Sequence, residues 1–178
     1  MTTDSIFPQV HPSALIGPGA VLQGQVTVGE DCFICPNAVL RGDIEPITLE
    51  RGSNVQDCCV VHTSRGNPAV ICEEASIGHG AVIHGATIGK SAMIGMNAVV
   101  LDGAVVGEEA VVGAGCVVPM GMTIPPRCLA VGTPARIVKE DDERIADIAR
   151  KNGVRYLRYR DEHVAGRWGT SGEQQPKA

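Results

Sequence analysis

The chain has 178 residues, a net charge of −5 and only 3% aromatic residues. No cluster of Lys or Arg suited to phosphate contacts stands out, so we expect no nucleic-acid partner. No apolar stretch approaches the roughly 20 residues of a membrane span, and the first ten residues lack the features of a signal peptide. We therefore expect a cytoplasmic protein, with no membrane contact, whose seven cysteines are reduced thiols.

Branched apolar residues recur at every sixth position along most of the chain, and a small residue often stands four positions later. This is the hexapeptide repeat of a parallel β-helix, in which three hexads close a triangular coil and successive coils stack roughly 4.8 Å apart. The residues that the pattern directs inward are Val10, Ile16, Leu22, Val28, Ile34, Leu40, Leu49, Val55, Val61, Ile71, Ile77, Val82, Ile88, Ile94, Val100, Val106, Val112, Val118 and Ile124.

Most of the cysteines fit the same register. Cys32, Cys59, Cys116 and Cys128 fall on the small inward position, where we expect buried packing residues rather than reactive thiols. Cys32 and Cys35 form a C-x-x-C motif, but they belong to different hexads and are not expected to form a redox or zinc site. The repeat is interrupted at residues 43–48 and 63–69, and such loops on a rigid scaffold often carry function.

The repeat stops after Ile124, and the segment from about Glu140 to Lys151 predicts a helix, because acidic residues open it and Gly153 follows it. Ile137, Ile145 and Ile148 are expected to form its apolar stripe, packed along the outside of the prism. We therefore predict a β-helix domain over residues 1–135, a helix with its extension over 136–165, and a disordered tail over 166–178.

Three of the five histidines are placed by the repeat at two corners of the prism. His62 and His84 follow strands of one face in neighbouring coils, whereas His79 follows a strand of the preceding face. A threefold trimer would bring the two corners together across a subunit boundary. Three neutral imidazoles around an open fourth position are typical of a catalytic zinc, which lowers the pKa of bound water to about 7. Imidazole also suits ferrous iron and cobalt.

The same register assigns the remaining histidines and the nearby polar residues to the ends and faces of the prism. His11 and His163 lie at the ends of the fold and are expected on the surface. Arg41 and Asp43 fall on the face of His62, while Gln56 and Asp57 fall on the face of His79. Arg41 is therefore expected to meet Asp57 of a neighbouring subunit, and Gln56 to lie one coil from His79.

Several stretches resemble the γ-class carbonic anhydrases over roughly residues 10–160: RGDI at 41–44, NVQDCCVVH at 54–62, IGHGAVIHGATIG at 77–89, GMNAVVLDGAVVG at 95–107 and GTPAR at 132–136. The resemblance implies an all-β, left-handed parallel β-helix with a C-terminal helix, assembled as a homotrimer. It implies that His62, His79 and His84 bind the metal between subunits, and that metal-bound hydroxide converts CO2 to bicarbonate. It implies that Gln56 orients the hydroxide, that Arg41, Asp43 and Asp57 support the site, and that Tyr156 in RYLRYRDEH lies near the metal.

The chain departs from the founding enzymes of that family in its proton-transfer groups. Ile44 stands where those enzymes carry a Glu, and the loop after His62 contains no acidic residue. Two other functions therefore stay open. A hexapeptide acyltransferase or thioesterase acting on acyl-CoA would need only one His as a base, and a non-catalytic metal-binding assembly module would need no proton shuttle.

Overall fold

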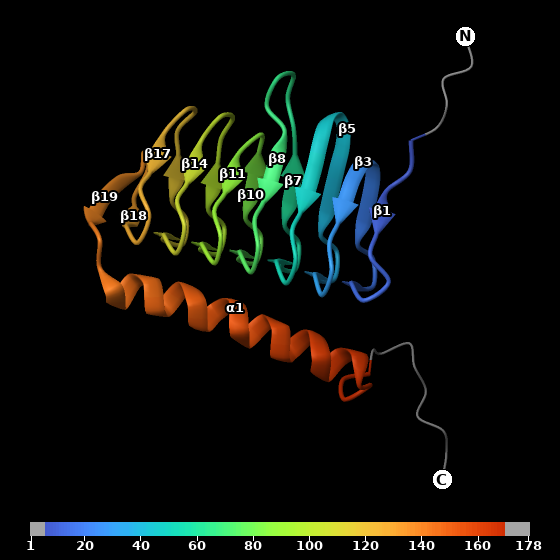
Figure 1. Ribbon diagram of the computed structural model, residues 1–178. Helices are drawn as coiled ribbons and strands as arrows, with labels where there is room; N and C mark the ends of the chain where they lie inside the picture. The colour runs from blue at the N-terminus through green and yellow to red at the C-terminus, as the bar shows by residue number, and fades with distance from the viewer. Residues whose placement is uncertain (1–5, 170–178) are drawn as a thin grey trace.

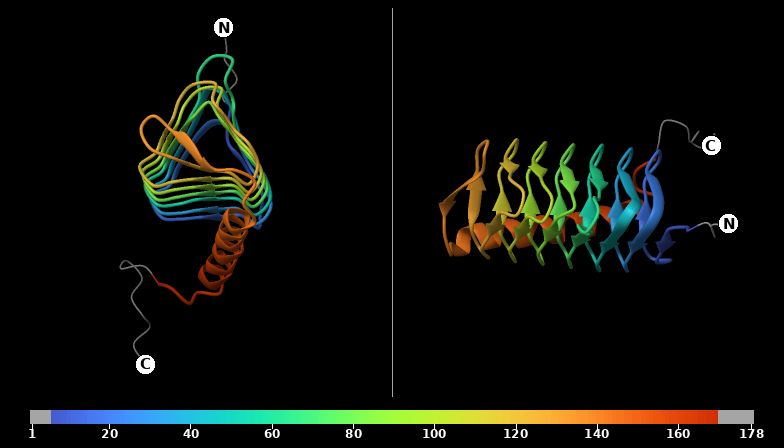
Figure 2. Two further views of the ribbon diagram at one scale, coloured as in Figure 1. Left: turned by 90° about the vertical axis from the view of Figure 1, so that its left-hand side faces the viewer. Right: turned by 90° about the horizontal axis from the view of Figure 1, so that it is seen from above.

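The structure is a computed structural model that describes residues 6–169, and they form a triangular parallel β-solenoid with a helix lying along its outside (Figure 1). Seen along its axis, the solenoid has three flat sides and the helix covers one of them (Figure 2). The hexapeptide period therefore predicted the fold class correctly, as a nearly all-β, stacked-coil solenoid with a C-terminal helix.

Each side of the prism is a ladder of short strands. The side under the helix contains β2 (Leu15–Ile16), β4 (Phe33–Ile34), β6 (Asn54–Val55), β9 (Ser76–Ile77), β12 (Met93–Ile94), β15 (Val111–Val112), β18 (Leu129–Val131) and β19 (Arg136–Lys139). The second side contains β7 (Val60–His62), β10 (Val82–His84), β13 (Val99–Val100) and β16 (Val117–Val118). The third contains β1 (Gln9–Val10), β8 (Ala69–Ile71), β11 (Thr87–Ile88), β14 (Val105–Val106) and β17 (Thr123–Ile124). Two long strands, β3 (Val21–Val28) and β5 (Val39–Leu49), bend around the corner between the second and third sides.

All neighbouring strands pair in parallel except β18 and β19, which are antiparallel and end the solenoid. The corners need residues with a left-handed backbone, which explains the Asn and Gly that recur there. Asn37 and Asn97 have φ values of 60° and 56°, and Gly80 has φ 69°. These corners fix where each following strand begins and therefore where the side chains beside them project.

Most of the predicted inward residues are buried; Ile16 and Leu22, near the N-terminal end of the solenoid, are partly buried, and Val10 and Val82 depart further from the pattern. Ile34, Leu40, Ile77 and Ile94 are fully buried, as are the inward cysteines, which confirms the register in most coils. Val82, however, pairs with Val60 and faces outward, while Ile83 is the buried residue. The repeat is one residue short between Ile83 and Ile88, where Gly85, with φ 57°, forms a tight turn. Val10 is 40% exposed because no coil precedes its own.

The two interruptions of the repeat have different structures. Residues 43–48 are absorbed into the long strand β5. Residues 63–68 form a loop that projects from the corner farthest from the helix (Figure 1) and is closed by an isolated bridge between Ser64 and Asn67. Both interruptions lie at the same corner of the prism, because β5 pairs with β7 before the corner and with β8 after it.

The helix α1 (Glu143–Val164) is longer than predicted and packs through different residues. Gly153 does not end it, because the helix passes so close to the coil that a Cβ there would lie 2.8 Å from the carbonyl oxygen of Glu74. Ile145 is buried as expected, but Ile148 is 51% exposed and Ile137 belongs to β19. Small residues, Ala146 and Ala149, complete the buried stripe.

The helix runs back along the solenoid from β15 past β12 and β9 to β4. Its far end is held by an ion pair between Arg160 and Asp31, whose Nη2 and Oδ1 are 2.9 Å apart. No helix within residues 6–169 is long and apolar enough to cross a membrane. Of the tail expected to be disordered, residues 170–178 lie outside the described part of the chain, while the Trp168 indole donates to Glu162.

Candidate metal centre

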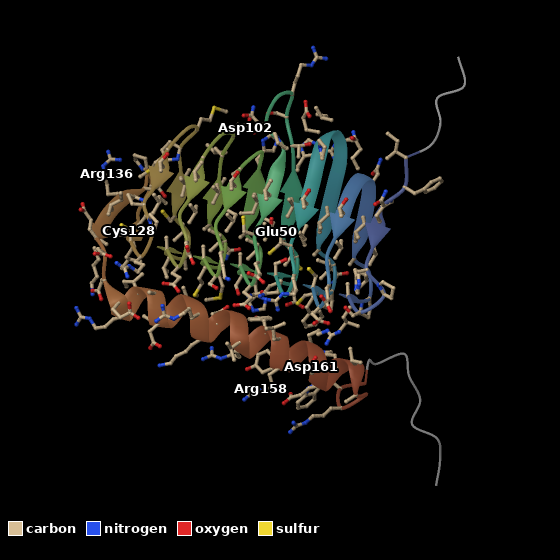
Figure 3. The ribbon with its side chains drawn as sticks, in the orientation of Figure 1. Glu50, Asp102, Cys128, Arg136, Arg158 and Asp161 are labelled. Atoms are coloured by element: carbon tan, nitrogen blue, oxygen red, sulfur yellow. The ribbon has the colours of Figure 1, made fainter. Side chains whose placement is uncertain are left out.

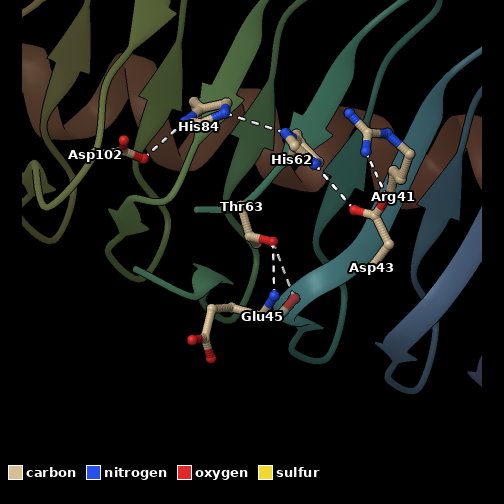
Figure 4. A network of polar contacts seen from close by, with 7 residues as sticks. All are labelled: Arg41, Asp43, Glu45, His62, Thr63, His84 and Asp102. Carbon is tan, nitrogen blue, oxygen red and sulfur yellow. Dashed lines mark hydrogen bonds and ion pairs between the residues drawn. The ribbon is translucent and has the colours of Figure 1, made fainter. Parts of the chain in front are cut away.

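His62 and His84 lie side by side at the corner of the prism where β7 and β10 end. The two residues are register partners in adjacent parallel strands, and Arg41 occupies the same position one coil earlier. The Nδ1 atom of His62 is 3.1 Å from the Nε2 atom of His84 (Figure 4). The spacing in the sequence therefore predicted this pair correctly.

Each of these rings is held by a carboxylate at its other nitrogen. Nδ1 of His84 donates to Asp102 Oδ1 at 2.7 Å, and Nε2 of His62 donates to Asp43 Oδ1 at 3.0 Å. Asp43 in turn accepts from Arg41 Nη1 at 2.5 Å, and this hydrogen bond holds the pKa of Asp43 below its ordinary value. Carboxylates placed in this way fix both the orientation and the tautomer of a metal-ligating imidazole.

The fixed tautomers direct two lone pairs toward one another. A nitrogen that donates to a carboxylate carries the hydrogen, so the opposite nitrogen of each neutral ring is an acceptor. His62 Nδ1 and His84 Nε2 are these acceptors, and only a cation or a shared proton stabilises them at 3.1 Å. Two nitrogen ligands of a tetrahedral zinc, with bonds of about 2.0–2.1 Å, are separated by roughly 3.3 Å. The pair therefore fits two adjacent ligands of one metal ion.

His79 stands at the other end of the same side of the prism, in the turn before β10. Gly80 follows it in the left-handed conformation, and a Cβ at Gly80 would collide with the Asn97 side chain, so the turn requires glycine. The His79 side chain is 48% exposed, against 14% for His62. Its Nδ1 donates to Asp57 Oδ2 at 2.8 Å, which leaves Nε2 as an acceptor pointing outward.

Tyr156 reaches His79 from the helix. The Tyr156 hydroxyl lies 3.2 Å from Nε2 of His79 and donates to it. Burial raises the pKa of Tyr156 above its ordinary value, so the phenol keeps its proton and its role as a donor at neutral pH. The structure thus places Tyr156 against one of the three predicted ligands.

Gln56 lies beneath the turn that carries His79, as the register predicted. It is 4% exposed, its Oε1 accepts from the backbone N–H of His79 at 3.2 Å, and its Nε2 donates to Asn54 Oδ1. A second buried contact, from Asn54 Nδ2 to Ser76 Oγ, continues this polar stack. Gln56 therefore fixes the position of His79.

One chain does not assemble all three imidazoles. Within residues 6–169, no group of three His, Cys, Asp or Glu side chains converges in a way that could hold a metal ion. His79 and His84 are separated by the length of β10, on the order of 15 Å at about 3.3 Å per residue. Arg41 contacts Asp43, and Asp57 contacts His79, so the expected pairing of Arg41 with a neighbour's Asp57 stays a prediction.

The sequence interpretation missed Asp102. It lies 18 residues after His84, one full coil, and this period was the signal that could have identified it. Glu45 was also passed over. Glu45 connects strand β5 to the loop after His62. Its Oε1 accepts from the backbone N–H of Gly66. Its own backbone N–H donates to the buried Thr63 hydroxyl, which in turn donates to the Glu45 carbonyl oxygen (Figure 4).

Three buried thiols, those of Cys32, Cys35 and Cys59, are unsuited to act as alternative ligands. Burial raises the pKa of Cys59 to about 11 and also raises the pKa of Cys32 and of Cys35, so these sulfurs are protonated at neutral pH. A protonated, buried thiol is a poor metal ligand and a poor nucleophile. His11 and His163, expected on the surface, are indeed exposed.

Known proteins resemble both the repeat and the site-bearing coils. A family model described as bacterial transferase hexapeptide (six repeats) matches residues 7–42 and 85–119. A probable carbonic anhydrase from Methanocaldococcus jannaschii is 50% identical over 149 residues, which cover 84% of this chain and 94% of that protein. The chain belongs to the γ-class carbonic anhydrase-like family of hexapeptide-repeat proteins. This confirms the resemblance seen in the sequence motifs.

Other relatives show how widely this γ-class-like scaffold is shared. The carnitine operon protein CaiE of Citrobacter koseri is 42% identical over 137 residues, covering 77% of this chain and 70% of that protein. A solved structure of a candidate acetyltransferase from Bacillus cereus has a TM-score of 0.86 and 35% identity, covering 89% of this chain and 92% of that chain. Family membership therefore establishes the fold, whereas the reaction has to be argued from the site.

Proposed function

We propose that the chain is a γ-carbonic anhydrase-like metalloenzyme that reversibly hydrates CO2 to bicarbonate at sites shared between subunits of a homotrimer. One observation carries this proposal: the carboxylate-fixed imidazoles of His62 and His84 direct two lone pairs toward each other at 3.1 Å. Their separation suits a metal ion, and the family member with 50% identity is named a probable carbonic anhydrase.

The metal would be held by His62 and His84 of one subunit and His79 of the next. Zinc is our first choice, and ferrous iron or cobalt would suit the same ligands. When bound, such an ion supplies a hydroxide nucleophile from water near neutral pH. Asp43, Asp57 and Asp102 each keep one ring nitrogen protonated, so that the other is free to bind a cation.

The outward surface of the second side supports a threefold assembly. Its strands present a ladder of valines that pair in register: Val21, Val39, Val60, Val82, Val99 and Val117. Val21 and Val60 are 49% and 38% exposed, so a single chain leaves an apolar stripe in water. The stripe lies between the His79 corner and the His62–His84 corner. Burying the stripe around a threefold axis would remove apolar surface from water. It would also bring the His79 corner of one subunit next to the His62–His84 corner of its neighbour.

The other predicted site residues act around the metal in this proposal. Gln56, whose amide is fixed by Asn54 and the His79 backbone, would orient the attacking oxygen. Tyr156 already touches His79 and would lie beside the site. Arg41 holds Asp43 in place within its own chain, and we expect it also to reach Asp57 of the neighbouring subunit. We place the enzyme in the cytoplasm, because all seven cysteines are unpaired.

Acyl transfer is the second candidate function, and the resemblance to the Bacillus cereus structure favours it. A hexapeptide acyltransferase or thioesterase would use one histidine as a base and would not depend on a metal. The three carboxylate-fixed histidines favour hydration instead, since such carboxylates are typical of metal-bound imidazoles.

A CO2 hydration assay tests the proposal directly. The full-length protein is loaded with zinc, with cobalt, or with ferrous iron under anaerobic conditions, and initial rates are followed by a pH indicator in stopped flow. We expect metal-dependent hydration that is lost in His84→Ala but kept in His11→Ala, a histidine remote from the site. Absence of hydration with every metal, despite metal binding, would contradict the catalytic function and leave a metal-binding module.

A further inference from the structure

A groove of about 540 Å³ lies between the helix and the side of the prism that it covers. It runs from His79 across the next two coils to the segment Val111–Ala114, and the helix supplies its other wall. CO2 and bicarbonate have three and four heavy atoms, so a groove of this size has room for a much larger molecule. The proposed hydration reaction uses only the end of the groove that Gln56, His79 and Tyr156 line, and leaves the rest of it free.

The floor of the groove is apolar and open. Met93 and Val111 line it from adjacent coils, and Met96 lies at its edge with 53% exposure. Gly95 and Gly113 between them carry no side chain that would fill the space. Flexible methionine side chains adapt to aliphatic groups of different shapes. The floor therefore suits a short aliphatic chain.

The helix wall offers one unused acceptor and one unused cation. The Oδ1 atom of Asn152 is buried and has no hydrogen-bond partner within residues 6–169. An orphan acceptor of this kind is costly unless a donor reaches it. Arg155, one turn further along, lines the groove and makes no ion pair with any described residue. No acidic side chain lines the groove, so its local charge is positive in a protein of net charge −5.

We propose that this groove binds a small organic anion consisting of a carboxylate and a short aliphatic chain that carries a hydrogen-bond donor. The carboxylate pairs with Arg155, whose planar guanidinium matches two carboxylate oxygens. The chain lies over Met93 and Val111, and the donor reaches Asn152 Oδ1. The proposal does not depend on the metal, because none of these four residues is among the histidines that would hold it.

Methyl NMR of the full-length protein tests the proposal. The methionine methyl groups are labelled with ¹³C and the protein is titrated with 3-hydroxyhexanoate. We expect saturable shifts for Met93 and Met96, while Met120, which is 67% exposed and does not line the groove, stays unchanged. Hexylamine, with the opposite charge, should produce no saturable shift. Plain hexanoate should bind more weakly than the hydroxy acid, and Asn152→Leu should remove that difference.

The matched control comes from the same helix. Arg155→Gln should weaken binding at least about tenfold, since it removes a charge-assisted contact. Arg158→Gln should bind as the wild type does, because Arg158 points away from the coils (Figure 3), with Glu162 3.7 Å away. Circular dichroism checks that both variants are folded. The proposal is overturned if no saturable shift occurs, if hexylamine gives the same shift, or if folded Arg155→Gln binds unchanged. A groove filled by a neighbouring subunit would also give no shift and would equally overturn it.

Discussion

Asp102 lies one coil beyond His84 and accepts a hydrogen bond from its Nδ1 at 2.7 Å. The carboxylate is close because Gly85 has no side chain, and a Cβ there would lie 2.3 Å from Asp102 Oδ1 and 2.7 Å from Asn67 Cβ. The motif that places glycine after His84 thus has a physical reason. It admits both the carboxylate and the loop after His62 to the corner that carries His62 and His84.

Asp102 should therefore control metal affinity without binding the metal itself. Asp102→Asn replaces the charged acceptor with an amide, so that His84 is no longer held in one tautomer. We expect metal affinity to fall about 10–100-fold, as is usual when such a carboxylate is removed. Competition with a chromophoric chelator measures the affinity. Asp147→Asn, on the exposed side of the helix, serves as the control. Equal affinities in Asp102→Asn and wild type would refute this role.

The valine ladder should control assembly. Val82→Asp places a charge in the middle of the apolar stripe and should dissociate the trimer, because an unpaired charge is costly to bury. Val105→Asp is the matched control, since Val105 is 40% exposed on the outward surface of the third side. Sedimentation velocity at micromolar concentration distinguishes trimer from monomer. The proposed interface is wrong if both variants sediment alike.

The sequence predicted the positions of several candidate site residues more accurately than it predicted the helix. The six-residue period placed His62 beside His84 and Gln56 beneath His79, because inward residues in a stacked coil repeat at fixed intervals. It misplaced Val82 because Val82 and Ile83 are both apolar, so the pattern alone does not show which of the two points inward. The short turn at Gly85 determines that Ile83 is the buried residue.

The helix shows what the six-residue period could not supply, whereas the missed carboxylate of Asp102 was within its reach. Gly153 looked like a helix end, but it is the point of closest approach to the coil at Glu74. Asp102 stands 18 residues after His84, the spacing of three hexads, so a search for partners one coil away would have found it.

Asp142 caps the N-terminal end of α1, and its carboxylate accepts from the backbone N–H and the guanidinium of Arg144. These contacts lower the pKa of Asp142 from 3.8 to about 2, with the Arg144 side chain as the main cause. Because the folded-state pKa is lowered, the stabilisation is complete above about pH 4 and is lost as the pH falls toward 2.

Asp142→Ala should therefore lower the melting temperature at pH 7, and its difference from wild type should shrink steadily between pH 4 and pH 2. Asp142→Asn keeps an N-cap acceptor and should lie between the two. Calorimetry at a series of pH values makes the comparison. A difference that does not change with pH would show that the charge of Asp142 is irrelevant.

Proton release should limit turnover if the chain hydrates CO2. Ile44 cannot carry a proton, and Thr63, Ser64 and Asn67 do not titrate near neutrality. The rate at saturating CO2 should rise with imidazole buffer and fall in heavy water, since a group poised near pH 7 ordinarily performs this transfer. Ile44→Glu should raise the rate at low buffer, whereas Ile44→Gln should not. Fast turnover that is independent of buffer would contradict this account.

The shared site is tested most directly by mixing two inactive variants. His62→Ala and His79→Ala each damage every site of their own trimers. If each site joins His62 and His84 of one chain to His79 of the next, random trimers from an equal mixture restore about one quarter of the sites. Zinc bound per chain, measured after the mixture is unfolded and refolded together, should rise to about that fraction of wild type. Binding no higher than in either variant alone would contradict a site built from two subunits.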